Sequence, residues 1–112
     1  MNIFELPEEL LDRELFEPLI ETNQILIERI ISTGQTTPEG EWYDQPRDEW
    51  VLLLQGEAQL TYEDGTSIEL KAGDYVLIPA HQRHRVSYTS SNPACIWLAI
   101  HTVLARLYPF DE

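Results

Sequence analysis

The stretch GDYVLIPAHQRHRVSY, residues 73–88, contains an apolar run that ends at Pro79 and a second run that begins at His84. Two such runs, separated by a proline and a few polar residues, predict short β-strands over residues 75–79 and 84–89. The turn between them carries imidazole and guanidinium groups, which are common at functional sites. The stretch therefore predicts a β-structure with a polar, chemically capable turn.

Further short strands are predicted on both sides of this stretch. Most of them are separated by Gly, Pro, Asn or Asp, and Asp64-Gly65 is typical of a hairpin turn because both central positions must accept positive φ. About eight short, evenly spaced strands without helices between them indicate an antiparallel sandwich or barrel. The additional predicted strands cover residues 24–32, 41–45, 49–55, 57–63, 66–70 and 95–103.

The N-terminal stretch LPEELLDRELFEPLIE, residues 6–21, has a different pattern. Its leucines recur at roughly helical spacing, and acids follow Pro7, where the positive end of a helix dipole favours them. This predicts one or two short amphipathic helices, divided at Pro18, with a frayed acidic arm as the alternative. The expected organisation is a helical segment over 1–23, a β-barrel over 24–103 and a tail over 104–112.

Length and composition limit the class of protein. A chain of 112 residues, 43% apolar, is long enough for one compact domain. A net charge of −13 with only seven basic residues argues against nucleic acid or an anionic membrane as partner. The lone Cys95 reads as a small buried hydrophobe in a reducing compartment, and no apolar run is long enough to span a bilayer, so we expect a cytoplasmic protein.

Charge is unevenly distributed along the chain. Residues 75–110 contain no Asp or Glu but hold Arg83, Arg85, Arg106 and all three histidines. One end of the fold is therefore expected to be locally positive, and acidic small substrates are not excluded.

Two segments resemble the motifs of the cupin family. In QPRDEWVLLLQG, residues 45–56, the carboxylate Glu49 precedes a turn glycine by seven positions, as in the second half of the first cupin motif. Residues 73–88 are similar to the second motif, with a glycine, then a proline, then His84. The resemblance covers residues 40–101. It implies an all-β fold, the cupin-type double-stranded β-helix or jelly-roll barrel, in a small single-domain protein that forms a homodimer.

The family resemblance also implies a divalent metal held by two histidines, a carboxylate and the histidine of the second motif. The two histidine positions of the first motif fall on Tyr43 and Gln45, so that motif is degenerate. A glutamine offers only a neutral carbonyl oxygen, and a phenol must first lose a proton, so both are poorer ligands than imidazole.

Three titratable side chains are the main candidates for a site. Glu49 leads into a strongly apolar strand, where a carboxylate must be paired, metal-bound or at the mouth of the barrel. His84 points into the barrel by alternation, and His101 follows Cys95, Trp97 and Ala99 on one face of the last strand. We predict His84 as general acid or base with Glu49 orienting it. The predicted metal set, for Fe, Mn, Ni or Zn, is Glu49, His84, His101 and Gln45.

A second group of side chains is predicted at the pocket or its rim: Tyr43, His81, Arg83 and Tyr88. Arg83 could bind a carboxylate or phosphate, or it could pair with acids of the protein. Alternation places His81 on the opposite face from His84, so only a bend at residues 80–83 would bring both inward. The strand over 50–54 is apolar on both faces, and the face outside the barrel must be covered, which also favours a homodimer.

Three functions remain open from the sequence. The first is an interior pocket for a small molecule, such as an organic acid or a sugar-like compound, with metal-assisted or acid-base chemistry. The second is a ligand-binding or sensor cupin without turnover. The third is a dimeric interaction protein with a filled barrel. The sequence does not decide whether the protein is an enzyme, because one barrel fold supports many activities.

Overall fold

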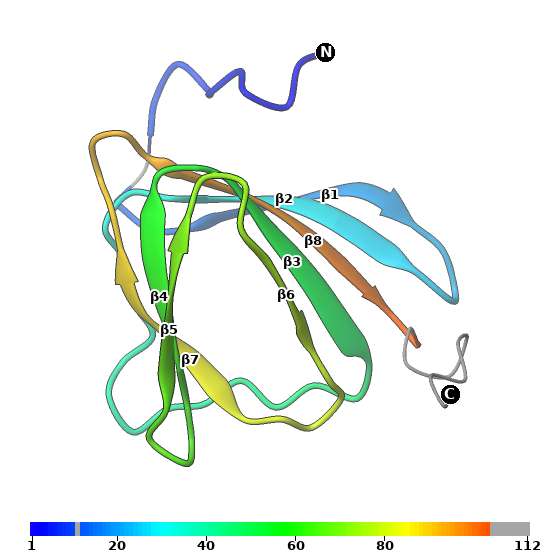
Figure 1. Ribbon diagram of the computed structural model, residues 1–112. Helices are drawn as coiled ribbons and strands as arrows, with labels where there is room; N and C mark the ends of the chain where they lie inside the picture. Colours follow the sequence, from blue (N-terminus) through cyan, green and yellow to red (C-terminus); the bar gives the residue numbers. More distant parts are fainter. Residues whose placement is uncertain (11, 104–112) are drawn as a thin grey trace.

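The computed structural model describes residues 1–10 and 12–103, and within them it contains eight β-strands (Figure 1). The strands form two antiparallel sheets that face each other. The predicted all-β architecture of antiparallel strands is confirmed. The strands are β1 (Leu15–Glu21), β2 (Leu26–Ser32), β3 (Asp48–Gln55), β4 (Glu57–Tyr62), β5 (Ser67–Lys71), β6 (Tyr75–Ile78), β7 (His84–Thr89) and β8 (Cys95–Thr102).

The larger sheet has five strands in the order β1-β2-β8-β3-β6. Its two central strands are β8 and β3, which pair in a register that places Glu49 opposite His101 and Val51 opposite Ala99. Alternation then directs Glu49, Val51 and Leu53 of β3 to the barrel interior. The register thus places the predicted acid and one predicted imidazole beside each other.

The smaller sheet has three strands in the order β5-β4-β7. The β4–β5 hairpin turns at Asp64-Gly65 as predicted, with Gly65 at φ 93° and the Tyr62 amide donating to the Thr66 carbonyl over 2.8 Å. On the other edge of β4, away from β5, strand β7 pairs with β4 and places His84 opposite Tyr62. The second predicted imidazole therefore enters the barrel from the sheet that faces Glu49.

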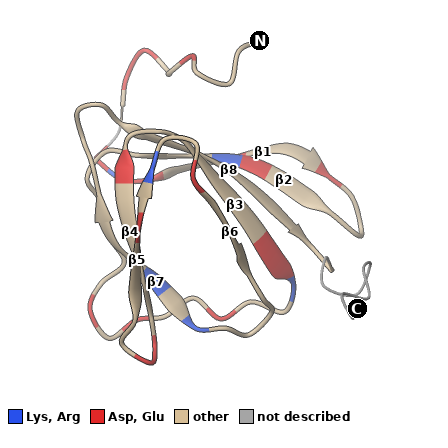
Figure 2. Cartoon of the chain, in the orientation of Figure 1, with Lys and Arg blue, Asp and Glu red and all other residues tan. Residues whose placement is uncertain are grey.

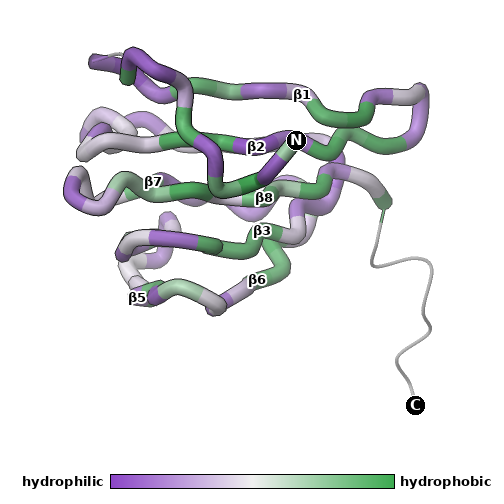
Figure 3. The backbone as a smooth tube through the Cα atoms, turned by 90° about the horizontal axis from the view of Figure 1, so that it is seen from above, coloured by the Kyte–Doolittle hydropathy of each residue, from purple (hydrophilic) through white to green (hydrophobic). Residues whose placement is uncertain are grey.

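Apolar side chains fill one part of the barrel interior. Leu53, Cys95 and Ala99 are fully buried, and hydrophobic residues lie mostly in the strands and hydrophilic ones mostly in the turns (Figure 3). At Gly56 the chain turns with φ +92°, and an added Cβ would lie 2.8 Å from the Ser90 hydroxyl and 2.9 Å from the Cys95 sulfur. Only glycine suits this close approach, so the motif glycine closes this end of the barrel.

The predicted N-terminal helix is wrong, because residues 15–21 form the edge strand β1 and the described residues contain no helix. Pro18 would break a helix interior, whereas an edge strand accepts it, here beside a register shift between Pro18 and Ile20. Residues 1–10 lie over the outer face of the five-stranded sheet (Figures 1 and 3), where the Arg29 guanidinium donates to the carbonyls of Ile3 and Glu5.

Two other expectations concern the ends and loops of the barrel. Residues 41–45, predicted as a strand, contribute one isolated bridge between Tyr43 and His84. The predicted tail over 104–112 lies outside the described residues.

Over the part of the chain that is described, no helix is long and apolar enough to cross a membrane. On the five-stranded sheet, acidic residues outnumber basic ones (Figure 2).

Candidate functional site

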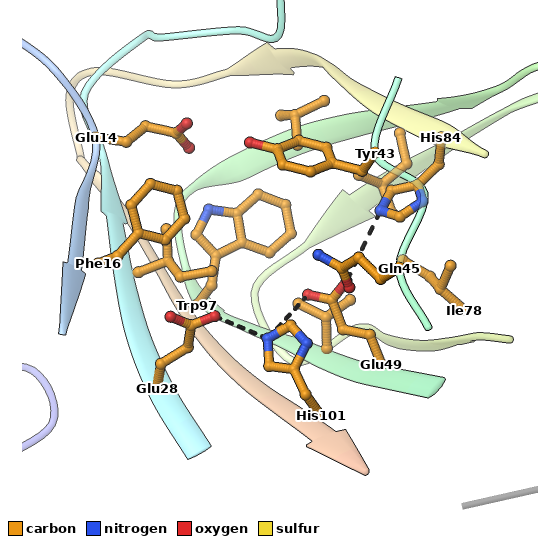
Figure 4. Close-up of a pocket in the computed structure, with 14 residues that line it drawn as sticks. Glu14, Phe16, Glu28, Tyr43, Gln45, Glu49, Ile78, His84, Trp97 and His101 are labelled. Carbon is orange, nitrogen blue, oxygen red and sulfur yellow. Dashed lines mark hydrogen bonds and ion pairs between the residues drawn. The ribbon is translucent and has the colours of Figure 1, made fainter. Parts of the chain in front are cut away.

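A pocket with a volume of about 70 Å³ lies inside the barrel between the two sheets (Figure 4). Its wall combines apolar and aromatic side chains with carboxyl, imidazole and amide groups. A volume of this size holds a few waters or a ligand of a few non-hydrogen atoms. The lining residues are Glu14, Phe16, Glu28, Ile30, Tyr43, Gln45, Glu49, Val51, Leu60, Ile78, His84, Val86, Trp97 and His101.

Glu49 lies at the centre of the polar part of this wall. Its carboxylate oxygens are 3.7 Å from His84 Nε2 and 3.9 Å from His101 Nε2, and the side chain is only 11% exposed. Burial raises the pKa of Glu49, and the two imidazoles partly offset that rise. The structure thus brings the three principal predicted site residues together from β3, β7 and β8.

His101 is held by a carboxylate that the sequence reasoning missed. Its Nε2 lies 2.7 Å from Oε2 of Glu28, and both side chains are largely buried. The hydrogen bond that His101 donates to Glu28 raises the pKa of His101, with burial opposing it. Glu28 could have been found, because it interrupts the apolar strand β2 just as Glu49 leads into β3, and a buried acid requires a partner.

His84 has a defined ring orientation. Its Nδ1 lies 2.9 Å from the Gln82 carbonyl, which can only accept, so Nδ1 carries a proton and donates it. The Nε2 atom is then left facing Glu49, and it is a hydrogen-bond acceptor in the neutral ring. Tyr43 stacks on this imidazole with ring centroids 5.6 Å apart. Main chain and aromatic ring together fix which nitrogen faces the pocket.

Two further polar groups complete the wall. The Oε1 atom of Gln45 is buried and has no hydrogen-bond partner among residues 1–10 and 12–103. Glu14, which precedes β1, accepts a hydrogen bond of 2.9 Å from Ser32, and burial raises the pKa of Glu14. Glu14 was also missed, because the sequence pattern around it predicted a helix outside the barrel.

Three of the four predicted rim residues lie outside this pocket; Tyr43 is the one that lines it. His81, at φ 64°, is largely exposed, and its Nδ1 lies 2.8 Å from the Asp44 carboxylate. Arg83 donates to Glu63 over 2.7 Å, which is the pairing with a protein acid left open above. Tyr88 is 49% exposed, and a register shift between β4 and β7 turns it to the outer surface beside Glu57 and Lys71.

The predicted metal ligands do not fit a divalent ion as they stand. Glu49, the Nε2 of His84 and the Oε1 of Gln45 face the pocket, but the Nε2 of His101 is already hydrogen-bonded to Glu28. Across residues 1–10 and 12–103, no group of three or more His, Cys, Asp or Glu side chains is arranged to hold a metal ion. A metal would require His101 to leave Glu28.

The sheet order and the interior acid–imidazole cluster define a cupin-type barrel with an internal pocket. The cupin-domain sequence profile matches residues 30–101, and the chain belongs to the cupin family. The predicted family is therefore confirmed.

Three relatives illustrate the range of this family. A Ralstonia eutropha JMP134 structure, described as that of a candidate mannose-6-phosphate isomerase, is 40% identical with a TM-score of 0.86, over 92% of this chain and 96% of that one. A cupin superfamily protein of Desulfitobacterium hafniense DCB-2 is 22% identical with a TM-score of 0.72, over 87% and 84%. The 3-hydroxyanthranilate 3,4-dioxygenase of Burkholderia cenocepacia is 37% identical over 59 residues, which are 50% of this chain and 33% of the dioxygenase.

Proposed function

We propose that this cupin binds a small molecule inside its barrel and transfers protons to and from it by acid-base chemistry. The observation that carries the proposal is the position of Glu49, 3.7 Å from His84 and 3.9 Å from His101 at the wall of a pocket. A cavity that brings together a group able to donate a proton and a group able to accept one is typical of acid-base sites. The open volume favours this function over a barrel that is filled with side chains.

The two central groups can divide the work. Burial raises the pKa of Glu49, which favours its carboxyl group as the proton donor of the site. His84 can accept one at Nε2 while its Nδ1 stays bonded to Gln82. Removal of one proton and delivery of another leaves the ligand isomerised without any further reactant. An isomerase-type reaction is consistent with the description of the Ralstonia eutropha relative.

A variant series tests the pocket and its chemistry. Nuclear magnetic resonance of the His84 and His101 rings, with a screen of small polyols, amines and acids, should find compounds that shift both signals. Glu49→Gln and His84→Ala should weaken that binding by about tenfold or more, because each substitution removes a buried polar partner of the ligand. Glu57→Gln, on the exposed start of β4, is the matched control. If no compound shifts the ring signals, the proposed function is wrong.

A ligand-binding or sensor role without turnover is separated from catalysis by one further measurement. A compound found in the screen is followed by proton–deuterium exchange at its carbon-bound hydrogens in heavy water. Exchange that depends on both Glu49 and His84 supports the acid-base role. Binding with no exchange supports the sensor role.

The predicted metal has its own test. We expect protein purified without chelator to contain less than stoichiometric Fe, Mn, Ni or Zn, because Glu28 engages the Nε2 atom of His101. Stoichiometric metal that is lost in both Glu49→Gln and His84→Ala would instead support the predicted metal set. In that case the Glu28→Gln variant should bind metal more tightly, since His101 is then free to ligate.

We further propose that two copies pair through the outer face of β3, β6 and β8. Tyr75 is 66% exposed there and packs on Trp50 with ring centroids 5.5 Å apart, and Leu77 is 39% exposed. An exposed aromatic and aliphatic face of this kind is typical of an interface. Sedimentation should show a dimer that Tyr75→Glu converts to monomer. Tyr88→Glu, an exposed tyrosine on the other sheet, should leave the dimer intact.

A further inference from the structure

The charged groups that line the pocket are mostly acids. Glu14, Glu28 and Glu49 all reach its wall, and none of the lining residues in the described part of the chain is Lys or Arg. Only an imidazole can supply positive charge there, and His101 is already paired with Glu28. Glu14 therefore has no basic partner among the lining residues, and Glu49 has only the two imidazoles, 3.7 Å and 3.9 Å away.

The arginines expected to make one end of the fold positive do not reach the pocket. Arg83 pairs with Glu63, and Arg85 donates to the Thr37 carbonyl. Arg106 lies outside the described residues. Arg47 is close enough to oppose the rise in the pKa of His101, but it does not line the cavity.

Hydrogen-bonding capacity in the wall is biased toward acceptors. Gln45 Oε1 is buried without a partner. By contrast, one donor of the wall is already used, because Trp97 Nε1 donates to the Ser32 hydroxyl over 3.2 Å. A buried acceptor without a partner is costly, so a ligand that brings N–H or O–H groups is favoured.

The remaining wall is apolar and partly aromatic. Phe16, Tyr43 and Trp97 line the same cavity and lie beside its polar groups (Figure 4). The face of an aromatic ring carries partial negative charge, which attracts cations and disfavours anions. A positively charged ligand is thus favoured by the carboxyl groups, by the unpaired amide oxygen and by the aromatic rings.

We propose that the ligand of this pocket is a small organic cation, a compound of a few non-hydrogen atoms with a protonated primary amino group. This rests on the proposed function, of which it names the ligand class. The ammonium group donates to Glu49 and to Gln45 Oε1, and the rest of the molecule contacts the aromatic wall. Phosphate esters and carboxylates are disfavoured, because three carboxyl groups and no Lys or Arg line the pocket.

Three probes that share a two-carbon framework test the ligand class: ethanolamine, ethylene glycol and glycolate. Ring signals of His84 and His101 report binding in the pocket. Ethanolamine should bind at least about tenfold more tightly than ethylene glycol, since a charge-assisted hydrogen bond replaces a neutral one. Glycolate should not bind. Glu49→Gln and Gln45→Leu should each weaken ethanolamine binding by about tenfold, and Glu57→Gln should not.

The outcomes separate this inference from the proposed function. Binding of ethylene glycol or glycolate in preference to ethanolamine, lost in Glu49→Gln, would overturn the cation class and leave the acid-base pocket standing. If all three probes fail to shift the ring signals while other compounds of the screen do so, the cation class is likewise overturned and the acid-base pocket stands. Failure of every compound would overturn both.

Discussion

The two ends of the barrel interior are built by the same strands yet differ in content. At one end, Leu53 of β3 and Cys95 of β8 are fully buried, and Gly56 packs closely against Cys95. At the other end, Glu49 and His101 of the same two strands face a cavity. The comparison teaches that stability and function occupy successive inward positions of one strand, since every second residue of β3 points inward.

The largest effect is expected where the filled end is broken. Leu53→Ala should lower the free energy of unfolding by about 2–5 kcal/mol, because it removes buried contacts and leaves a cavity in a wall that cannot collapse fully. Leu53 is 0% exposed, so the substitution removes only contacts with other protein atoms, and the full loss of packing energy is expected. Chemical denaturation measures it. A loss under about 1 kcal/mol would show that the filled end is not tightly packed.

A smaller effect, dependent on pH, is expected at the hollow end. The pKa of Glu49 is raised above its ordinary value of 4.5 by burial, so the protonated carboxyl stabilises the fold below that pH. This contribution is lost as the pH rises through the raised pKa. Glu49→Gln should therefore gain stability relative to the wild type between pH 4.5 and neutrality.

Denaturation of both proteins across that pH range checks the sign. The pKa of His101 is also raised, above 6.5, so its contribution is lost as the pH rises beyond that value in both proteins. Because Glu49 also helps to raise the pKa of His101, the difference between the two proteins reports Glu49 together with its effect on His101. If the variant loses stability relative to the wild type as the pH rises, the ionised carboxylate is the stabilised form and our account of Glu49 fails.

The smallest effect on stability is expected at Gln45. Its Oε1 makes no hydrogen bond within the protein, so Gln45→Leu should change the free energy of unfolding by less than about 0.5 kcal/mol or raise it slightly. Thermal denaturation measures this. A loss of more than about 1 kcal/mol would indicate that the amide supports the fold rather than a ligand.

The sequence was sufficient for most of the barrel and for the centre of the site. Alternation along β7 and β8 predicted that His84 and His101 face inward, and the family resemblance together with the cost of burying an unpaired carboxylate made Glu49 a candidate. The barrel brings those strands together. Sequence reasoning failed at the N-terminus, because the leucine spacing of residues 6–21 suits a helix while tertiary pairing with β2 selects a strand. Glu14 was lost with that error.

Tyr88 illustrates a second limit. Regular alternation places it on the same face as His84, but the register shift between Gln59 and Leu60 reverses the direction of its side chain. A one-residue irregularity in pairing leaves no trace in a single strand's pattern. Partners such as Glu28 for His101 likewise depend on which strands become neighbours, here β2 and β8.

The most direct test of the acid–imidazole cluster is the titration of the His101 ring, followed by nuclear magnetic resonance in the wild type, Glu28→Gln and Glu49→Gln. We predict a wild-type pKa above the ordinary 6.5, lowered most in Glu28→Gln and less in Glu49→Gln, because both carboxylates favour the imidazolium. A His101 pKa of ordinary value that neither substitution changes would contradict the convergence of these side chains in one pocket.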